Sequence, residues 1–174
     1  RMLKAMRRGI DRPKTEKLIE EVRKKVPDIA IRTTLISGFP GETQDDFKEM
    51  YDWVEAMRFD RLGIFTYSHE ENTHAFSMAD DVPDEVKKQR AEEIMDLQGG
   101  ISWELNEAKV NKEFKVLFDR VEGDYFIGRT EYDSPDVDNE VLVKKESDAY
   151  VRIGDFANVR IDRFDHYDLY GTLV

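Results

Sequence analysis

The sequence predicts an α/β unit followed by a small all-β barrel. Up to about residue 107, short β-branched segments alternate with amphipathic helical patterns. From residue 113 onwards, five short segments with partial alternation are separated by turn-forming residues. The chain is 40% hydrophobic and 37% charged, a composition typical of a folded chain with a buried core. We therefore expect two domains, residues 1–107 and 108–174.

The first unit begins with two helices and a strand. A short helix ends at Gly9, and Pro13 begins the next one, because a proline in the first helical turn forfeits no backbone hydrogen bond. The segment IAIRTTLIS, residues 29–37, is the strongest strand candidate in this half. Thr43 then occupies a helix N-cap position with Asp46 three residues later, which is the spacing of a capping box.

A second strand and a long helix complete this unit. The segment RLGIFTYS, residues 61–68, follows the amphipathic helix and makes a strand–helix–strand unit, so the two strands should be parallel neighbours. Pro83 and Asp84 begin a longer helix, in which we expect Gly99 and Gly100 to cause a kink or a loosened turn.

The second unit is predicted to contain five strands in roughly sixty residues, a pattern typical of a small antiparallel barrel of the OB type. The segments are EFKVLFD, DYFIGRT, EVLVKK, ANVRID and YDLYGTL.

Composition restricts the function. The chain has no cysteine, which excludes disulfides, thiolate zinc sites and thiolate-held iron–sulfur clusters within it. No apolar run approaches the ~18 residues of a membrane helix, and no signal-peptide pattern opens the sequence. The net charge of −11 favours a basic partner over nucleic acid. We expect a cytoplasmic protein and, because the first residue is not methionine, a piece of a longer one.

The stretch LISGFPGET, residues 35–43, ends the first strand with two glycines and a proline. It lies at the carboxyl end of a parallel strand, where α/β folds bind ligands. Glycines allow close backbone approach, and the following helix N-terminus favours an anionic group. The alternative, a tight strand-to-helix connection without a ligand, explains the same residues equally well. The lysine and the spacing of a nucleotide-binding P-loop are missing.

Several motifs in order resemble radical S-adenosylmethionine methylthiotransferases, specifically the RimO branch, which modifies an aspartate β-carbon in a small-subunit ribosomal protein. The motifs are RMLKAMRRG, IRTTLISGFPGET, FDRLGIFTYSHEENTHA and LQGGIS, followed by a tail, GRTEYDSPDVDNEVLV and YDLYG, that resembles a TRAM domain. The resemblance covers nearly all 174 residues. It implies the later part of a partial TIM-like barrel followed by a TRAM barrel.

The resemblance also implies cofactors: S-adenosylmethionine and two 4Fe-4S clusters in the full-length parent. The cluster cysteines would precede Arg1, so this chain alone should be inactive, with no catalytic residue and no metal ligand of its own. The positions implied to contact S-adenosylmethionine are Ile36, Gly38, Phe39, Pro40, Gly41, Phe65 and Tyr67. For Ile36 and Phe65, ordinary core packing remains open as an alternative.

Three other features indicate a function less specifically. The radical-enzyme pattern GxIxGxxE places its glutamate where Gly41 stands, and Glu42 follows one step later, so stabilisation of the helix dipole explains Glu42 about as well. Adjacent Arg7 and Arg8 suit either an anion or solvent. His69 and His74, near Glu70 and Glu71, fit no recognised metal spacing and favour a solvated loop.

In the tail, we expect the substrate to be bound by Arg129, Asp133, Asp136 and Asp138. The acidic residues lack the ligand order of an EF-hand loop, and a basic ribosomal protein is the better electrostatic partner. Residues 108–174 hold 10 Lys and Arg against 15 Asp and Glu, a net charge of −5, whereas residues 1–107 carry −6.

Three alternatives stay open. In a tRNA methylthiotransferase the TRAM domain would bind RNA, for which Lys109, Lys112 and Lys115 offer a local basic strip. The chain could instead be a binding module without chemistry, or a phosphate-binding α/β enzyme. The charge balance makes RNA binding the less favoured reading.

Overall fold

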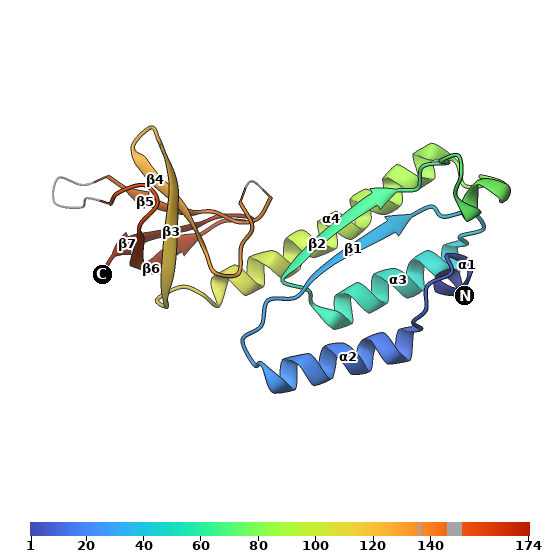
Figure 1. The fold of residues 1–174 in the computed structure, drawn as a ribbon, viewed down its shortest axis with the longest axis horizontal. Coiled ribbons are helices and arrows are strands. Elements are labelled where there is room, and N and C mark those ends of the chain that lie inside the picture. Colours follow the sequence, from blue (N-terminus) through green and yellow to red (C-terminus); the bar gives the residue numbers. More distant parts are fainter. Residues whose placement is uncertain (136, 146–150) are drawn as a thin grey trace. The chain divides into compact units, whose positions relative to one another are not determined.

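The computed structural model describes residues 1–135, 137–145 and 151–174 (Figure 1). The chain divides into two compact units, Arg1–Gln98 and Gly99–Val174. The described residues contain no helix that is both long and apolar enough to cross a membrane.

The first unit follows the predicted order of elements. Its helices and strands are α1 (Met2–Ala5), α2 (Arg12–Lys25), β1 (Arg32–Ser37), α3 (Gln44–Met57), β2 (Arg61–Thr66), the short 3-10 helix η1 (His74–Ser77) and the first part of α4 (Asp84–Glu107). Strands β1 and β2 are parallel neighbours, as predicted, with Ile36 opposite Phe65 and Ser37 opposite Thr66. Helix α4 continues through Gly99 and Gly100.

Local capping explains where α2 and α3 begin. The Asp11 carboxylate accepts the Lys14 N–H at 3.1 Å, ahead of the proline in the first turn of α2. The capping box of α3 is confirmed, since the Thr43 hydroxyl accepts the Asp46 N–H at 3.2 Å and the Asp46 carboxylate accepts the Thr43 N–H at 2.9 Å. Each cap satisfies backbone donors that the first helical turn leaves unpaired.

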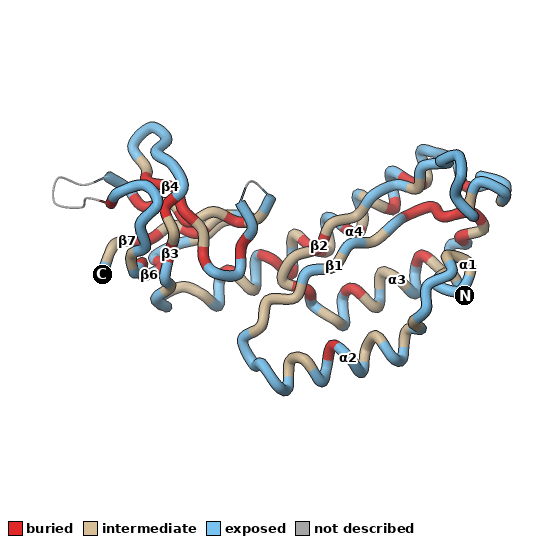
Figure 2. Tube along the Cα trace, viewed as in Figure 1, coloured by how far each residue is buried: buried red, intermediate tan, exposed pale blue. Residues whose placement is uncertain are grey.

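The apolar core of the first unit draws on α3, α4 and the segment that leads into β2 (Figure 2). Val54 and Ile94 are fully buried, and Phe59 is 1% exposed. Two apolar residues of the strands are exposed and not buried: the exposed fraction is 40% for Ile36 and 67% for Phe65. One face of the β1–β2 sheet therefore stays uncovered near its carboxyl end.

The second unit contains a closed five-stranded barrel at the five predicted positions. Its strands are β3 (Glu113–Glu122), β4 (Tyr125–Thr130), β5 (Val141–Lys144), β6 (Phe156–Phe164) and β7 (Leu169–Leu173), in the spatial order β3-β4-β5-β7-β6. The predicted fold class is confirmed, apart from one strand pair. Strands β5 and β7 run parallel, so the barrel is mixed rather than wholly antiparallel. The reason is that β6 pairs with both β3 and β7, which leaves β7 to close the barrel against β5.

Two glycines allow the barrel strands to approach closely. A Cβ on Gly128 would lie 2.4 Å from the carbonyl oxygen of Leu117, and one on Gly171 would lie 2.3 Å from that of Arg160. Both glycines belong to strands that surround a core of mainly valine, isoleucine and phenylalanine. At such positions a side chain is excluded by neighbouring backbone.

Candidate functional site

The turn after β1, residues 38–41, has a defined backbone conformation. The Glu42 N–H donates to the Phe39 carbonyl oxygen at 2.9 Å, with Pro40 and Gly41 between them. Gly41 has φ +78°, so this is a β-turn with proline in its second position and a glycine of positive φ in its third. That arrangement is typical of a type II turn and explains the Pro-Gly pair.

Gly38 is required by helix α4. Its φ is +72°, and a Cβ at this position would lie 2.2 Å from the Cγ of Lys87. The Ser37 hydroxyl donates to the Lys87 carbonyl oxygen at 2.9 Å. The end of β1 and α4 thus meet at a distance that only a glycine allows.

Most donors that were expected to face an anion are used by the chain itself. The Gly38 N–H donates to Glu42 Oε1 at 3.0 Å, and the Gly41 N–H donates to Asp81 Oδ1 at 2.7 Å. The Asp46 carboxylate accepts the Thr43 N–H and is paired with Arg1, which lowers the pKa of Asp46 to about 2. An anion at this turn would have to displace a carboxylate from each donor. The geometry therefore favours ligand contact elsewhere at this strand end.

Glu42 lies near the start of a helix but is buried and not exposed. Its Oε1 accepts a hydrogen bond from Arg90 Nη1 at 2.7 Å, and the two side chains are 4% and 8% exposed. The carboxylate therefore pairs with α4 and with the turn, rather than facing an open site.

The predicted apolar contacts, Ile36 and Phe65, are register partners on parallel strands and share one sheet face with Gly63. A Cβ on Gly63 would meet nothing within 4 Å. We call this surface, formed by Ile36, Gly63 and Phe65, the Ile36/Phe65 face. Since both large side chains are exposed, it is an uncovered apolar platform and not part of the core.

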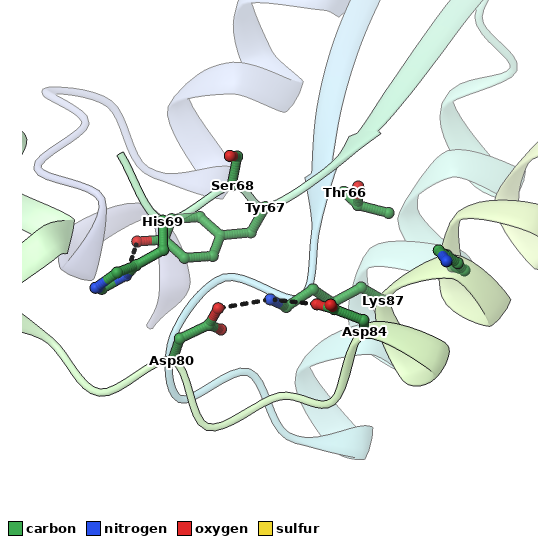
Figure 3. Close-up of a pocket in the computed structure, with 8 residues that line it drawn as sticks. Thr66, Tyr67, Ser68, His69, Asp80, Asp84 and Lys87 are labelled. Atoms are coloured by element: carbon green, nitrogen blue, oxygen red, sulfur yellow. Dashed lines mark hydrogen bonds and ion pairs between the residues drawn. The ribbon is translucent and has the colours of Figure 1, made fainter. Parts of the chain in front are cut away.

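Tyr67 lies beside a cavity of about 360 Å³ just beyond β2 (Figure 3). Its N–H donates to the Ser37 carbonyl oxygen at 2.8 Å, and its hydroxyl lies 3.1 Å from His69 Nδ1. The rings of Tyr67 and Phe39 form a T-shaped pair, with the centroids 5.3 Å apart. The structure thus brings together Phe39 and Tyr67, two of the predicted cofactor residues.

A buried lysine forms one wall of this cavity. Lys87 Nζ donates to Asp80 at 2.8 Å and to Asp84 at 3.1 Å, and it lies 5.4 Å from the Tyr67 ring centroid (Figure 3). Burial lowers the pKa of Lys87, but the hydrogen bonds to both carboxylates outweigh it, so the pKa is raised. The cluster therefore holds a charged ammonium at this strand end. Sequence reasoning missed it, and the one available signal was the Asp84–Lys87 spacing at the start of α4.

Among the residues whose predicted role was less specific, His69 also lines this cavity, next to the Tyr67 hydroxyl. His69 stacks near Phe76, with the ring centroids 4.7 Å apart. The described part of the chain contains no group of three or more His, Cys, Asp or Glu residues that could hold a metal ion. Arg7, the residue after the C-cap Met6 of α1, has a left-handed φ of 55°.

The second unit has its own polar cavity, of about 230 Å³, between β3, β4 and the loop before β5. Arg129 and Asp138, two of the predicted substrate residues, both line it. Arg129 Nε donates to Asp119 at 3.0 Å, and the Asp138 carboxylate accepts the Ser134 N–H at 2.7 Å.

The other two predicted substrate residues are not part of this cavity lining. Asp133 is 6% exposed and accepts the Thr130 hydroxyl at 2.5 Å, which fits a role in holding the loop. Asp136 lies outside the described residues.

Comparison with known proteins agrees with this architecture. Residues 110–174 match the model of the TRAM domain. The match begins just before β3 and includes all five barrel strands.

Relatives extend the similarity to nearly the whole chain. A protein of Cytophaga hutchinsonii named ribosomal protein uS12 methylthiotransferase RimO is 63% identical over 173 residues, which is 99% of this chain and 39% of the relative. Proteins of the same name from Christiangramia forsetii and Flavobacterium johnsoniae are 59% and 56% identical over 98% of the chain, and the chain covers 38% and 39% of them. The predicted resemblance to RimO-type methylthiotransferases is thereby confirmed, and the chain spans about two fifths of the length of these curated relatives.

Proposed function

We propose that this chain is part of a methylthiotransferase that modifies ribosomal protein uS12 in the cytoplasm, at the β-carbon of an aspartate, by radical S-adenosylmethionine chemistry. The observation that carries the proposal is the 63% identity to a protein of that name over 99% of the chain. At that level of identity the fold and the local architecture are expected to be shared, and the relative extends beyond the matched 39% of its length.

The residues present fit one part of the implied cofactor set. The Ile36/Phe65 face offers an exposed apolar platform at the carboxyl end of parallel strands, suited to the flat face of a purine. The chain has no cysteine, so it supplies no thiolate to an iron–sulfur cluster. When bound at a cluster held by the rest of a longer protein, S-adenosylmethionine supplies the radical chemistry.

The chain's own contribution is therefore to shape and close one side of the cofactor site. Ile36 and Phe65 provide apolar contact, and Tyr67 extends the strand end above the buried Lys87. The 38–41 turn, hydrogen-bonded to Glu42 and Asp81, borders this edge of the sheet. In isolation, the chain should show no methylthiotransferase activity.

The TRAM barrel is proposed to bind the protein substrate. Residues 108–174 carry a net charge of −5, and a basic partner gains both attraction and faster encounter from an acidic surface. Asp138 and Arg129 at the barrel cavity would contact that partner. The proposed pairing predicts affinity that falls with added salt.

A binding titration tests this proposal. The 174-residue chain is titrated with purified uS12 and, separately, with tRNA, at ionic strengths between about 0.05 and 0.3 M, where screening changes strongly. We expect salt-sensitive binding of uS12 and binding of tRNA that is at least tenfold weaker. Tighter, salt-sensitive binding of tRNA would instead support a tRNA-modifying enzyme.

A further inference from the structure

We propose that Glu42 is a positioning residue, whose buried carboxylate, held by Arg90 of α4, sets the conformation of the 38–41 turn beside the Ile36/Phe65 face. The inference rests on the proposed function, because that function makes the turn one edge of a cofactor site. It concerns how the turn is held, and it can be tested without any cofactor.

One oxygen atom joins the turn to helix α4. Glu42 Oε1 accepts the Gly38 N–H at 3.0 Å and Arg90 Nη1 at 2.7 Å. The Glu42 side chain is 4% exposed and that of Arg90 is 8% exposed. A charge left unpaired at such depth is strongly unfavourable, so each group keeps the other in place. The Gly38 amide is thus held by an ionised acceptor, which forms stronger hydrogen bonds than a neutral one.

Arg90 also ties this carboxylate to the start of α3. Its Nη1 donates to the Glu42 carbonyl oxygen and its Nη2 to Gln44 Oε1, both at 3.3 Å. The guanidinium lies 5.4 Å from the ring centroid of Phe47, a buried residue of α3. A lysine could not reproduce this planar set of contacts.

Helix α4 holds the other end of the turn through Lys87, one helical turn before Arg90. The Lys87 carbonyl oxygen accepts a hydrogen bond from the Ser37 hydroxyl at 2.9 Å, and the Lys87 side chain lies against the Gly38 backbone. The turn is consequently fixed from both sides by one rigid helix. Glu42 supplies the contact on the α3 side, and direct ligand contact by its carboxylate is disfavoured by its burial.

Amide hydrogen exchange, measured residue by residue by NMR on the 174-residue chain, tests this role. In Glu42→Gln, the Gly38 amide loses its ionised acceptor. Its hydrogen exchange should therefore accelerate roughly 10-fold to 100-fold, because that factor corresponds to the free energy of a hydrogen bond to a charged group. Two amides in the same region serve as internal references, Gly41 bonded to Asp81 and Tyr67 bonded to Ser37. Both should change less than about threefold, because local opening is independent of global unfolding.

The matched control is Asp45→Asn, which removes a negative charge from the exposed first turn of α3 without touching Gly38. It should leave the exchange rate of the Gly38 amide unchanged. Equal acceleration of the Gly38, Gly41 and Tyr67 amides in Glu42→Gln would show a general loss of stability and overturn the positioning role. An unchanged Gly38 amide would overturn it as well.

A second variant keeps the test decisive if Glu42→Gln does not fold. Arg90→Lys retains the positive charge but loses the planar guanidinium, and it should accelerate exchange at Gly38 selectively, by a smaller factor than Glu42→Gln. No selective change in that variant would reject the proposal. Since neither measurement involves uS12 or S-adenosylmethionine, a negative result here is separate from failure of the proposed enzymatic function.

Discussion

Replacing Gly38 with alanine tests whether α4 dictates the turn beside the candidate site. The φ of +72° is unfavourable for alanine by about 1–2 kcal/mol. The new Cβ would lie 2.2 Å from Lys87 Cγ, and crowding of this kind in a buried site costs a further ~1–3 kcal/mol. Lys87 cannot move away freely, because its ammonium is bonded to Asp80 and Asp84. The free energy of unfolding of the first unit should therefore fall by about 2–5 kcal/mol.

Gly63→Ala is the matched control, since its Cβ would enter open space on the neighbouring strand. It should be neutral or stabilise by up to about 1 kcal/mol, because alanine loses less conformational entropy on folding. Urea unfolding followed by Trp53 fluorescence, in a Trp103→Phe background, reports on the first unit alone. A loss below about 1 kcal/mol for Gly38→Ala, or equal effects of the two substitutions, would show that α4 does not require a glycine at this position.

Three further outcomes are expected. Gly171→Ala should destabilise the barrel by about 1–3 kcal/mol, because its Cβ would lie 2.3 Å from the backbone oxygen of Arg160; amide NMR signals of the second unit during urea unfolding measure this. The pKa of Asp46 is lowered to about 2, so its stabilising contribution is fully present above about pH 4 and is lost as the pH falls towards 2; Asp46→Asn should flatten that part of the unfolding profile of the first unit. Asp138→Asn should weaken uS12 binding about threefold to tenfold, whereas exposed Asp155→Asn should change it less than about twofold; calorimetric titration that finds equal effects would remove Asp138 from the proposed contact surface.

The parts of the fold that local chemistry determines were predictable from the sequence. Pro13, the Thr43–Asp46 capping box and the alternation of the five barrel segments each indicate an element on their own, and all appear in the structure. The parallel β5–β7 pair was not predictable in the same way, because the closing partner of the last strand depends on how the other strands are arranged in space.

The candidate site was predictable only in part. The resemblance selected Ile36 and Phe65, yet their exposure depends on which sheet face the helices cover, and periodicity does not reveal that. The sequence also did not reveal that Glu42 and Asp81 accept hydrogen bonds from the N–H groups of the turn, since the bonded residues are 4 and 40 positions apart. A buried lysine such as Lys87 runs against the usual distribution of charged residues, so no sequence rule favours it.

The mass of uS12 decides whether this chain belongs to an enzyme acting on a ribosomal protein. Ribosomal protein uS12 is isolated from cells with the gene for this protein intact and from cells in which it is deleted, and peptide mass spectrometry locates any added methylthio group. We predict the group on one aspartate in the first sample and its loss in the second. An identical uS12 in both samples, together with loss of a methylthio group from tRNA after deletion, would contradict it.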